Sequence, residues 1–218
     1  MKHTDRLTEL VFILDRSGSM EGLEKDTIGG FNSMIARQKQ QPGRAVVSTV
    51  LFDNNSTVIH DRVPLDQVPP MTEKEYYTRG CTALLDAVGD AIRHIGNIHK
   101  YARREDVPER TLFVITTDGY ENASHHYDYP AVQKMIQRQK QRYGWEFLFL
   151  GANIDAAREA ARFGIASNRA VKYRCDEEGT ALNYEVISQA VCCMRETGSL
   201  QDNWKAAIEK DMENREML

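Results

Sequence analysis

The sequence lacks any long apolar run. Its 218 residues include 28 Lys and Arg and 32 Asp and Glu, which gives a net charge of −4. No stretch is apolar over the length that a signal peptide or a membrane-spanning helix needs, and the beginning, Met1 to Asp5, is polar. We therefore expect a cytoplasmic protein that does not bind a membrane.

The signatures of several functional classes are missing as well. Basic residues do not gather in a stripe, so nucleic-acid binding has no electrostatic support. There is no glycine-rich phosphate-binding loop with a following Lys, and no serine–histidine–acid arrangement is evident. These absences argue against an enzyme, and we expect no catalytic residues.

The four cysteines show no pattern of a metal site. They stand at positions 81, 175, 192 and 193, and neither their spacing nor nearby histidines match a zinc site. We expect four small, buried hydrophobic side chains in a reducing compartment.

What the sequence does have is a regular alternation of apolar runs and helix-period stretches. The apolar runs predict strands at residues 7–14, 45–52, 57–63, 112–115, 146–150 and 170–173. Apolar residues at helical spacing predict helices at residues 21–40, 82–101, 130–142, 154–163 and 180–195. This order indicates an α/β fold, a doubly wound Rossmann-like and mainly parallel sheet with helices on both faces. The polar turn after residue 52 predicts a hairpin that adds one antiparallel edge strand.

Two glycines stand inside the first predicted helix. Gly29 and Gly30 each cost roughly 1 kcal/mol relative to alanine in a helix interior. We expect close approach of this helix to the sheet to compensate.

The C-terminal segment has an apolar stripe of its own. Trp204, Ile208 and Met212 recur every four residues, as on one face of a helix. We expect residues 198–218 to form a helical tail docked on a domain of residues 1–197, with a partner-binding helix as the alternative.

The first predicted strand ends in the segment Asp15-Arg16-Ser17-Gly18-Ser19. Alternate side chains of an extended turn point to the same side, so Asp15, Ser17 and Ser19 can converge on one point. Oxygen groups without nitrogen or sulfur suit a hard divalent cation such as Mg²⁺. A loop that caps the following helix is the alternative interpretation.

Two more oxygen-bearing residues follow at matching places. Thr82 stands at the start of a predicted helix, and Asp118 follows the fourth predicted strand. Each alone is equally typical of a helix cap or a turn. In a parallel sheet, however, ligands gather at the carboxyl ends of the strands, and all three segments fall at that edge.

This set resembles the metal-ion-dependent adhesion site (MIDAS) of von Willebrand factor A domains. The resemblance rests on Asp15-Arg-Ser17-Gly-Ser19, Thr82 and Asp118-Gly119, and the order of elements agrees over roughly the first 165 residues. It implies a von Willebrand factor A domain over residues 1–197, in which the hydroxyls of Ser17, Ser19 and Thr82 bind Mg²⁺, Mn²⁺ or Ca²⁺ directly. It also implies that Asp15 and Asp118 act largely through water and hydrogen bonds, and that a Glu or Asp of a protein partner fills an open coordination position.

The loops around this site are expected to form the partner-binding rim. We assign to it Tyr76, Tyr77, Arg79, Tyr120, Glu121 and His125. Tyrosines are good interface anchors, although they can also simply pack against their own loop. The pair His125-His126 could form an extra metal site or act as a catalytic base, but a histidine pair in a polar loop is usually just solvated. Glu121, beside the expected metal, is then the only plausible general base.

Two functions compete on this basis. Stand-alone bacterial proteins that resemble this family often act as adaptors, some with AAA+ ATPases and some in stress or metal-resistance systems, so a metal-dependent protein-interaction module is the first hypothesis. The second is a Mg²⁺-dependent hydrolase or phosphotransferase. Phosphatases of the haloacid-dehalogenase type carry a second Asp two residues after the first, where this chain has Ser17.

Overall fold

A six-stranded sheet forms the centre of the protein. The computed structural model describes residues 6–216, so the polar start Met1 to Asp5 and the last two residues of the tail lie outside the described residues. The strand order is β3-β2-β1-β4-β5-β6, and every neighbouring pair is parallel except β2 with β3. The strands are β1 (Leu7–Asp15), β2 (Arg44–Phe52), β3 (Ser56–Pro64), β4 (Arg110–Thr117), β5 (Glu146–Ala152) and β6 (Ala170–Tyr173).

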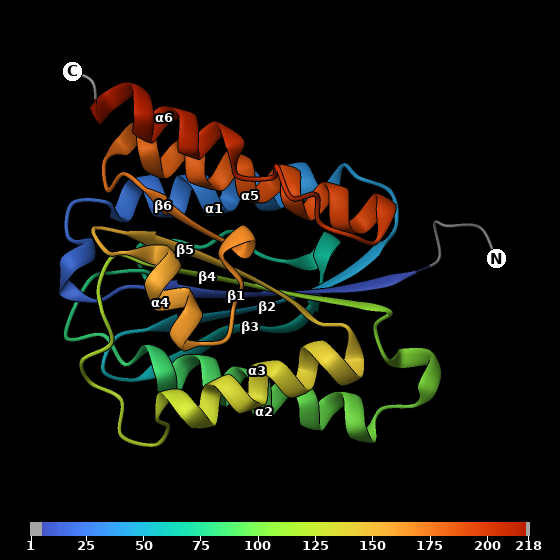
Figure 1. Cartoon of the computed structure of the whole chain (residues 1–218). Helices are drawn as coiled ribbons and strands as arrows, with labels where there is room; N and C mark the ends of the chain where they lie inside the picture. The colour runs from blue at the N-terminus through green and yellow to red at the C-terminus, as the bar shows by residue number, and fades with distance from the viewer. Residues whose placement is uncertain (1–5, 217–218) are drawn as a thin grey trace.

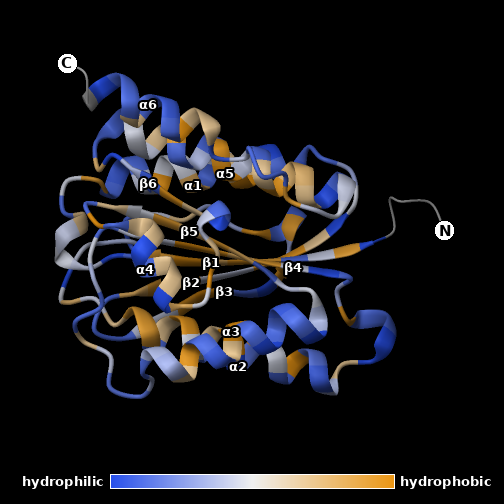
Figure 2. Ribbon diagram, viewed as in Figure 1, coloured by the Kyte–Doolittle hydropathy of each residue, from blue (hydrophilic) through white to orange (hydrophobic). Residues whose placement is uncertain are grey.

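Helices cover both faces of this sheet (Figure 1). One face carries α1 (Glu24–Lys39), α5 (Glu177–Thr197) and α6 (Ala206–Glu216), and the other carries α2 (Leu84–Tyr101), α3 (Tyr129–Tyr143) and α4 (Ala156–Arg162). Figure 2 shows hydrophobic strands between helices that are hydrophilic on their outer side. Two apolar clusters result, one on each side of the sheet.

The predicted fold class is confirmed. The fold is α/β and doubly wound, with one antiparallel strand, β3, at the edge. Element ends differ from the prediction by a few residues. Residues 18–20 form a short 3-10 helix, so α1 begins at Glu24, and α6 begins only at Ala206 because a turn precedes it.

The glycine pair in α1 has a different partner from the one expected. A Cβ atom on Gly30 would lie 2.3 Å from Cδ2 of Tyr184 in α5, whereas a Cβ on Gly29 would meet nothing within 4 Å. The expectation of a helix-to-sheet approach is therefore wrong. Gly30 instead lets α1 and α5 pack closely.

The C-terminal segment packs against α5 and β6. Trp204 and Ile208 are buried in the same apolar cluster as strand residues of β1, and Nε1 of Trp204 donates to the carbonyl of Asn168 at 2.8 Å. The boundary at Thr197 stays a prediction.

The cysteines are less buried than expected. Cys81 is exposed, and Cys175, Cys192 and Cys193 are half-buried free thiols. The expectation of four buried side chains is wrong for Cys81, which lies in the loop before α2 with its N–H bound to Asn54. No helix within residues 6–216 has the length and apolar character to cross a membrane.

Candidate metal centre

The sheet reverses its strand order between β1 and β4, and the candidate residues lie at that point. Asp15 is the last residue of β1, and Asp118 directly follows β4, its neighbour in the sheet. In Figure 1 these strand ends lie at the left edge of the sheet. Such a switch point is where open α/β sheets bind ligands.

Asp15 is buried and bound by its neighbours. Oδ1 accepts the Ser17 N–H at 2.7 Å, and Oδ2 accepts the Thr117 hydroxyl at 2.6 Å. Burial raises the pKa of Asp15 to about 6, although these hydrogen bonds act in the opposite direction. The carboxylate therefore shapes the loop, and its negative charge is costly without a nearby cation.

Ser17, Ser19 and Asp118 form a connected row of oxygens. The two serine hydroxyls lie 3.0 Å apart, and the Ser19 hydroxyl donates to Oδ1 of Asp118 at 2.5 Å. Burial raises the pKa of Asp118, against the hydrogen bond from Ser19. Ser19 is exposed whereas Ser17 and Asp118 are buried, so the row opens to solvent on the Ser19 side.

Thr82 completes the set from the loop before α2. A Cβ atom on Gly119 would lie 3.4 Å from Oγ1 of Thr82 and 3.6 Å from Oγ of Ser19, so both hydroxyls border the same small space. Asn122 holds this loop in place: its Oδ1 accepts the Thr82 N–H at 2.9 Å, and its own N–H donates to the Thr82 carbonyl at 3.0 Å. A Cβ at position 119 would therefore make ordinary van der Waals contact with both hydroxyls.

The donor set fits a hard divalent cation. Three hydroxyls and two carboxylates from three separate segments surround one space, and both carboxylates are raised in pKa by burial. Within the described residues, no group of three or more His, Cys, Asp or Glu side chains is placed to hold a metal ion. Ligation by the five residues stays a prediction.

A second charged group next to the site was missed by the sequence analysis. Oδ2 of Asp53 accepts Nε–H of both Arg16 and Arg79, each at 2.8 Å. Burial alone would raise the pKa of Asp53, but hydrogen bonds from Arg79, the Asn55 N–H and Arg16, together with the positive charge of Arg16, hold it below its usual value. Asp53 follows β2 just as Asp15 ends β1, and that matching position was the available signal.

The predicted rim residues divide into surface and core. Tyr77, Tyr120 and His125 are exposed, as is Arg79. Tyr76 is fully buried, and its hydroxyl donates to the Asp15 carbonyl at 2.6 Å. Its assignment to the rim is therefore wrong: Tyr76 anchors its loop beneath the candidate metal centre.

Glu121 is also not a free rim carboxylate. Its Oε2 accepts the Leu85 N–H at 2.8 Å, in the first turn of α2, and the Ser124 hydroxyl at 2.7 Å. Its Oε1 accepts the N–H groups of Ala123 and Ser124. The carboxylate therefore caps α2 and closes its own loop, and contact of Glu121 with a partner stays a prediction.

Cys175 is a further neighbour that the sequence did not reveal. Its Sγ lies 3.9 Å from Oδ2 of Asp118. Burial and the nearby Asp118 charge raise the pKa of the thiol to about 11. Since the thiolate is the nucleophilic form, this cysteine is chemically quiet at neutral pH.

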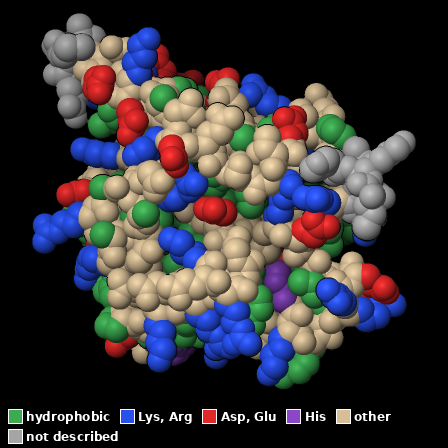
Figure 3. Space-filling view, turned by 45° about the vertical axis from the view of Figure 1, so that its right-hand side comes forward, with side chains coloured by type: hydrophobic (Ala, Val, Ile, Leu, Met, Phe, Trp, Pro, Cys, Tyr) green, Lys and Arg blue, Asp and Glu red, His purple; other side chains and the backbone are tan. Residues whose placement is uncertain are grey.

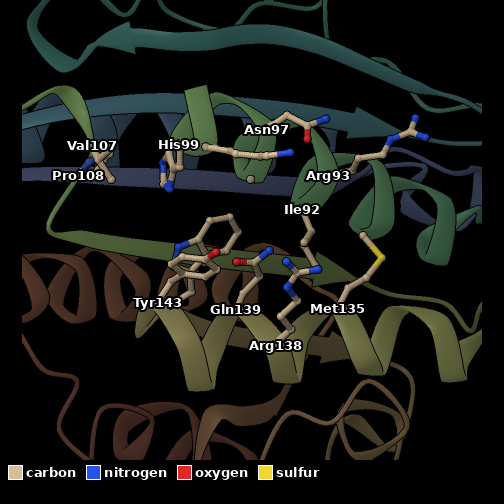
Figure 4. Close-up of a pocket in the computed structure, with 13 residues that line it drawn as sticks. Ile92, Arg93, Asn97, His99, Val107, Pro108, Met135, Arg138, Gln139 and Tyr143 are labelled. Atoms are coloured by element: carbon tan, nitrogen blue, oxygen red, sulfur yellow. The ribbon is translucent and has the colours of Figure 1, made fainter. Parts of the chain in front are cut away.

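A separate cavity of about 400 Å³ lies between α2 and α3. Figure 4 shows side chains of the two helices facing each other across it, with Asn97 on one side and Gln139 on the other. Trp145, just before β5, lines it, so the cavity lies at the edge of the sheet opposite the metal centre. His99, which lines the cavity, pairs with the buried Glu9.

The molecular surface agrees with the balanced charge. On the face shown in Figure 3, Lys and Arg side chains are interspersed with Asp and Glu, and hydrophobic side chains are scattered among them. This face offers no continuous basic stripe of the kind that tracks a phosphate backbone.

Comparison with known proteins identifies the fold. No family model and no curated protein sequence matches the chain. Proximal thread matrix protein 1 from the mussel byssus, in a structure with a zinc-occupied MIDAS motif, is similar at a TM-score of 0.58 and 15% identity, over 87% of this chain and 47% of that chain. The ArnB paralog VWA2 from Sulfolobus acidocaldarius is similar at a TM-score of 0.53 and 16% identity, over 85% of this chain and 45% of that chain. The von Willebrand factor domain of the type V pili tip protein Mfa5 from Porphyromonas gingivalis is similar at a TM-score of 0.63 and 11% identity, over 91% of this chain and 99% of that chain.

The chain thus has the fold of von Willebrand factor A domains. It spans about half the length of the mussel and Sulfolobus chains that it matches. Because all these identities are low, the likeness concerns the fold alone.

Proposed function

We propose that the protein is a metal-dependent protein-interaction module. The observation that carries the proposal is the convergence of Ser17, Ser19, Thr82, Asp15 and Asp118 on one small space at the switch point of the sheet. The mussel structure with a zinc-occupied MIDAS motif makes a divalent cation reasonable on this fold. We propose Mg²⁺, or alternatively Mn²⁺ or Ca²⁺, as the resident ion.

The five residues would hold the ion in two different ways. Ser17, Ser19 and Thr82 offer neutral hydroxyls, and Asp15 and Asp118 supply negative charge. When bound, the ion supplies an electrophilic centre for an incoming carboxylate, because hydroxyl ligands leave much of its charge uncompensated. Exposed Ser19 marks the open side, where an Asp or Glu of a protein partner has access.

Hydrolysis or phosphoryl transfer is the weaker hypothesis. Both oxygens of Glu121 accept hydrogen bonds from the protein, so the one candidate base is engaged. Position 17 is Ser rather than a second Asp. We therefore propose a binding role without catalysis, in keeping with an adaptor such as those that work with AAA+ ATPases or in stress and metal resistance in the cytoplasm.

Metal titration tests the first step. Mn²⁺ binding, followed by calorimetry or electron paramagnetic resonance, is expected at one site and is lost in Ser17→Ala/Ser19→Ala. Ser33→Ala, on the exposed side of α1, is the matched control and keeps wild-type affinity. Equal binding by the double variant and the control contradicts the assignment.

Capture of a partner tests the second step. Immobilised wild-type protein is expected to retain a partner in Mg²⁺ and to release it when a chelator is added, because metal and partner binding strengthen each other. The Ser17→Ala/Ser19→Ala variant retains nothing in Mg²⁺. A partner that stays bound under chelation and binds the variant equally well contradicts the metal-dependent mode.

A further inference from the structure

Beside the metal centre lies a group of two arginines and one aspartate that the proposed function does not use. The guanidinium groups of Arg16 and Arg79 share one carboxylate oxygen, Oδ2 of Asp53, at 2.8 Å each. Two positive charges thus face one negative charge, so one positive charge remains. The other oxygen, Oδ1, accepts the N–H of Asn55 at 3.0 Å.

The two arginines differ in how they are used. The Arg16 side chain is 3% exposed, and its Nη1 and Nη2 donate to the Glu75 carbonyl and the Thr57 hydroxyl. The Arg79 side chain is 49% exposed. Within residues 6–216, Arg79 donates from Nε to Asp53 and from Nη1 to Tyr77, and its Nη2 has no partner. Arg16 is therefore an anchor, and Arg79 presents N–H groups to solvent.

Tyr77 holds the exposed guanidinium in place. Its ring centroid lies 5.1 Å from Cζ of Arg79 and 5.4 Å from Cζ of Arg16, and its hydroxyl accepts from Arg79 at 3.0 Å. A guanidinium fixed in this way loses little conformational freedom when it binds a carboxylate. Two acids close in sequence or contact have other partners: Glu24, at the start of α1, accepts from the Thr78 hydroxyl, and Glu75 accepts from the Thr72 hydroxyl.

The spacing between this arginine and the metal centre follows from the sheet. Asp15 is paired with Phe52 in the register of β1 and β2, so Asp53 lies one strand away from Asp15. The Arg79 N–H donates to the Arg16 carbonyl at 2.9 Å, which keeps the Arg79 backbone alongside the metal loop. Adjacent strands are about 4.8 Å apart, so the exposed guanidinium lies roughly 5 to 10 Å from the centre.

We propose that the partner segment carries two acidic residues at positions i and i+2 of an extended chain, one directed to the metal centre and the other to Arg79. Alternate side chains of an extended chain point the same way and lie about 6.6 Å apart, within that range. A carboxylate on an arginine makes charge-assisted hydrogen bonds. This inference rests on the proposed function and gives two residues of the predicted rim, Arg79 and Tyr77, a specific role: they select a second acidic residue of the partner.

Synthetic peptides of Gly and Ser, about ten residues long as in extended-strand recognition, test the proposal. One peptide carries a single Glu, and three carry two Glu at spacings i,i+1, i,i+2 and i,i+4. Binding to wild type, Arg79→Gln and Arg79→Lys is measured by fluorescence anisotropy in Mg²⁺ and in chelator. Arg93→Gln, an exposed arginine of α2 paired with Asp90, is the matched control, and thermal melting checks that each variant folds.

In Mg²⁺, wild type and Arg93→Gln are expected to bind the i,i+2 peptide about three- to tenfold more tightly than the single-Glu peptide. Arg79→Gln loses this preference and keeps its affinity for the single-Glu peptide, while Arg79→Lys keeps part of the preference. An Arg79→Gln variant that retains the full preference, or a wild type that binds one- and two-Glu peptides equally in Mg²⁺, overturns the inference. Absence of Mg²⁺-dependent binding to every peptide instead overturns the proposed function on which it rests.

Discussion

Asp15 has a buried carboxylate with a second acid, Asp118, nearby. Its pKa is raised from 3.8 to about 6, mainly by burial. A group whose pKa is higher in the folded protein stabilises the fold at pH values below its unfolded pKa, and this stabilisation is lost as the pH rises through the folded pKa. Between about pH 4 and pH 6 the metal-free protein therefore loses stability through Asp15, by an amount on the order of 3 kcal/mol at most.

Asp15→Asn is expected to remove this loss. The metal-free variant should be more stable than metal-free wild type at about pH 7.5, by roughly 1 to 3 kcal/mol, and the gain should shrink at about pH 4. Urea unfolding in chelator at the two pH values measures the difference. With Mg²⁺ added, wild type should gain stability in proportion to metal binding while the variant does not. A variant less stable than wild type in chelator at neutral pH contradicts this prediction.

The pKa of Asp53 is shifted in the opposite direction from that of Asp15. Its pKa lies below the usual value because its contacts with the two arginines outweigh burial, so its contribution is present above the unfolded pKa and lost as the pH falls. Asp53→Asn leaves the buried Arg16 without a charged partner and should destabilise the protein by about 2 to 4 kcal/mol near neutral pH. The same urea experiment should show this loss shrinking below about pH 4; a pH-independent loss would mean that packing rather than charge is responsible.

Between elements, the packing of α1 on α5 depends on Gly30. Gly30→Ala places a methyl group within the Tyr184 ring, 2.3 Å from Cδ2, and should destabilise the protein by about 1 to 3 kcal/mol through overpacking. Gly29→Ala is the matched control in the same helix. It meets nothing within 4 Å and should stabilise by roughly 0.5 to 1 kcal/mol through helix propensity. Thermal melting distinguishes them, and two variants that shift in the same direction would contradict the assigned contact.

This contact also marks how far the elements could be predicted. Apolar runs and helical spacing predicted all six strands and the covering helices, because burial against a neighbouring layer imposes those patterns. They did not predict that Gly30 meets Tyr184, since the two residues are distant in sequence and nothing in either helix specifies its partner. The same limit applies to Tyr76. It is buried and its hydroxyl donates to the Asp15 carbonyl, but its loop has no apolar periodicity from which this burial could be predicted.

The candidate site was more predictable than the loops around it. Asp15, Ser17, Ser19, Thr82 and Asp118 each follow a strand or begin a helix, so fold class alone brings them to one edge. The capping role of Glu121 was not predicted because its partners, the N–H groups of Leu85, Ala123 and Ser124, are backbone groups that no side-chain pattern reveals. The contact of Asp53 with the two arginines was not predicted, because the aspartate stands in a polar turn after a strand, where aspartate is common without any further role.

For the whole molecule, the open question is whether the C-terminal segment belongs to the same cooperative unit as the sheet. The two tryptophans of the chain report from opposite layers: Trp145 lies in the cluster under α2 and α3, and Trp204 lies in the cluster under α1 and α5. Trp204→Phe and Trp145→Phe therefore give single-tryptophan proteins that follow each layer separately.

Both single-tryptophan proteins should unfold in one transition with the same midpoint in urea, because Trp204 and Ile208 share an apolar cluster with Leu10 and Phe12 of the central strand and coincident probes indicate two-state behaviour. Ile208→Ala, placed in each single-tryptophan protein, should reduce the free energy of unfolding by about 2 to 5 kcal/mol. Both urea midpoints should therefore fall together. Lys210→Ala, exposed on the same helix, should change neither. If Ile208→Ala moves only the Trp204 transition, residues 198–216 unfold as a separate appendage, and their packing contributes nothing to the stability of the sheet that carries the metal centre.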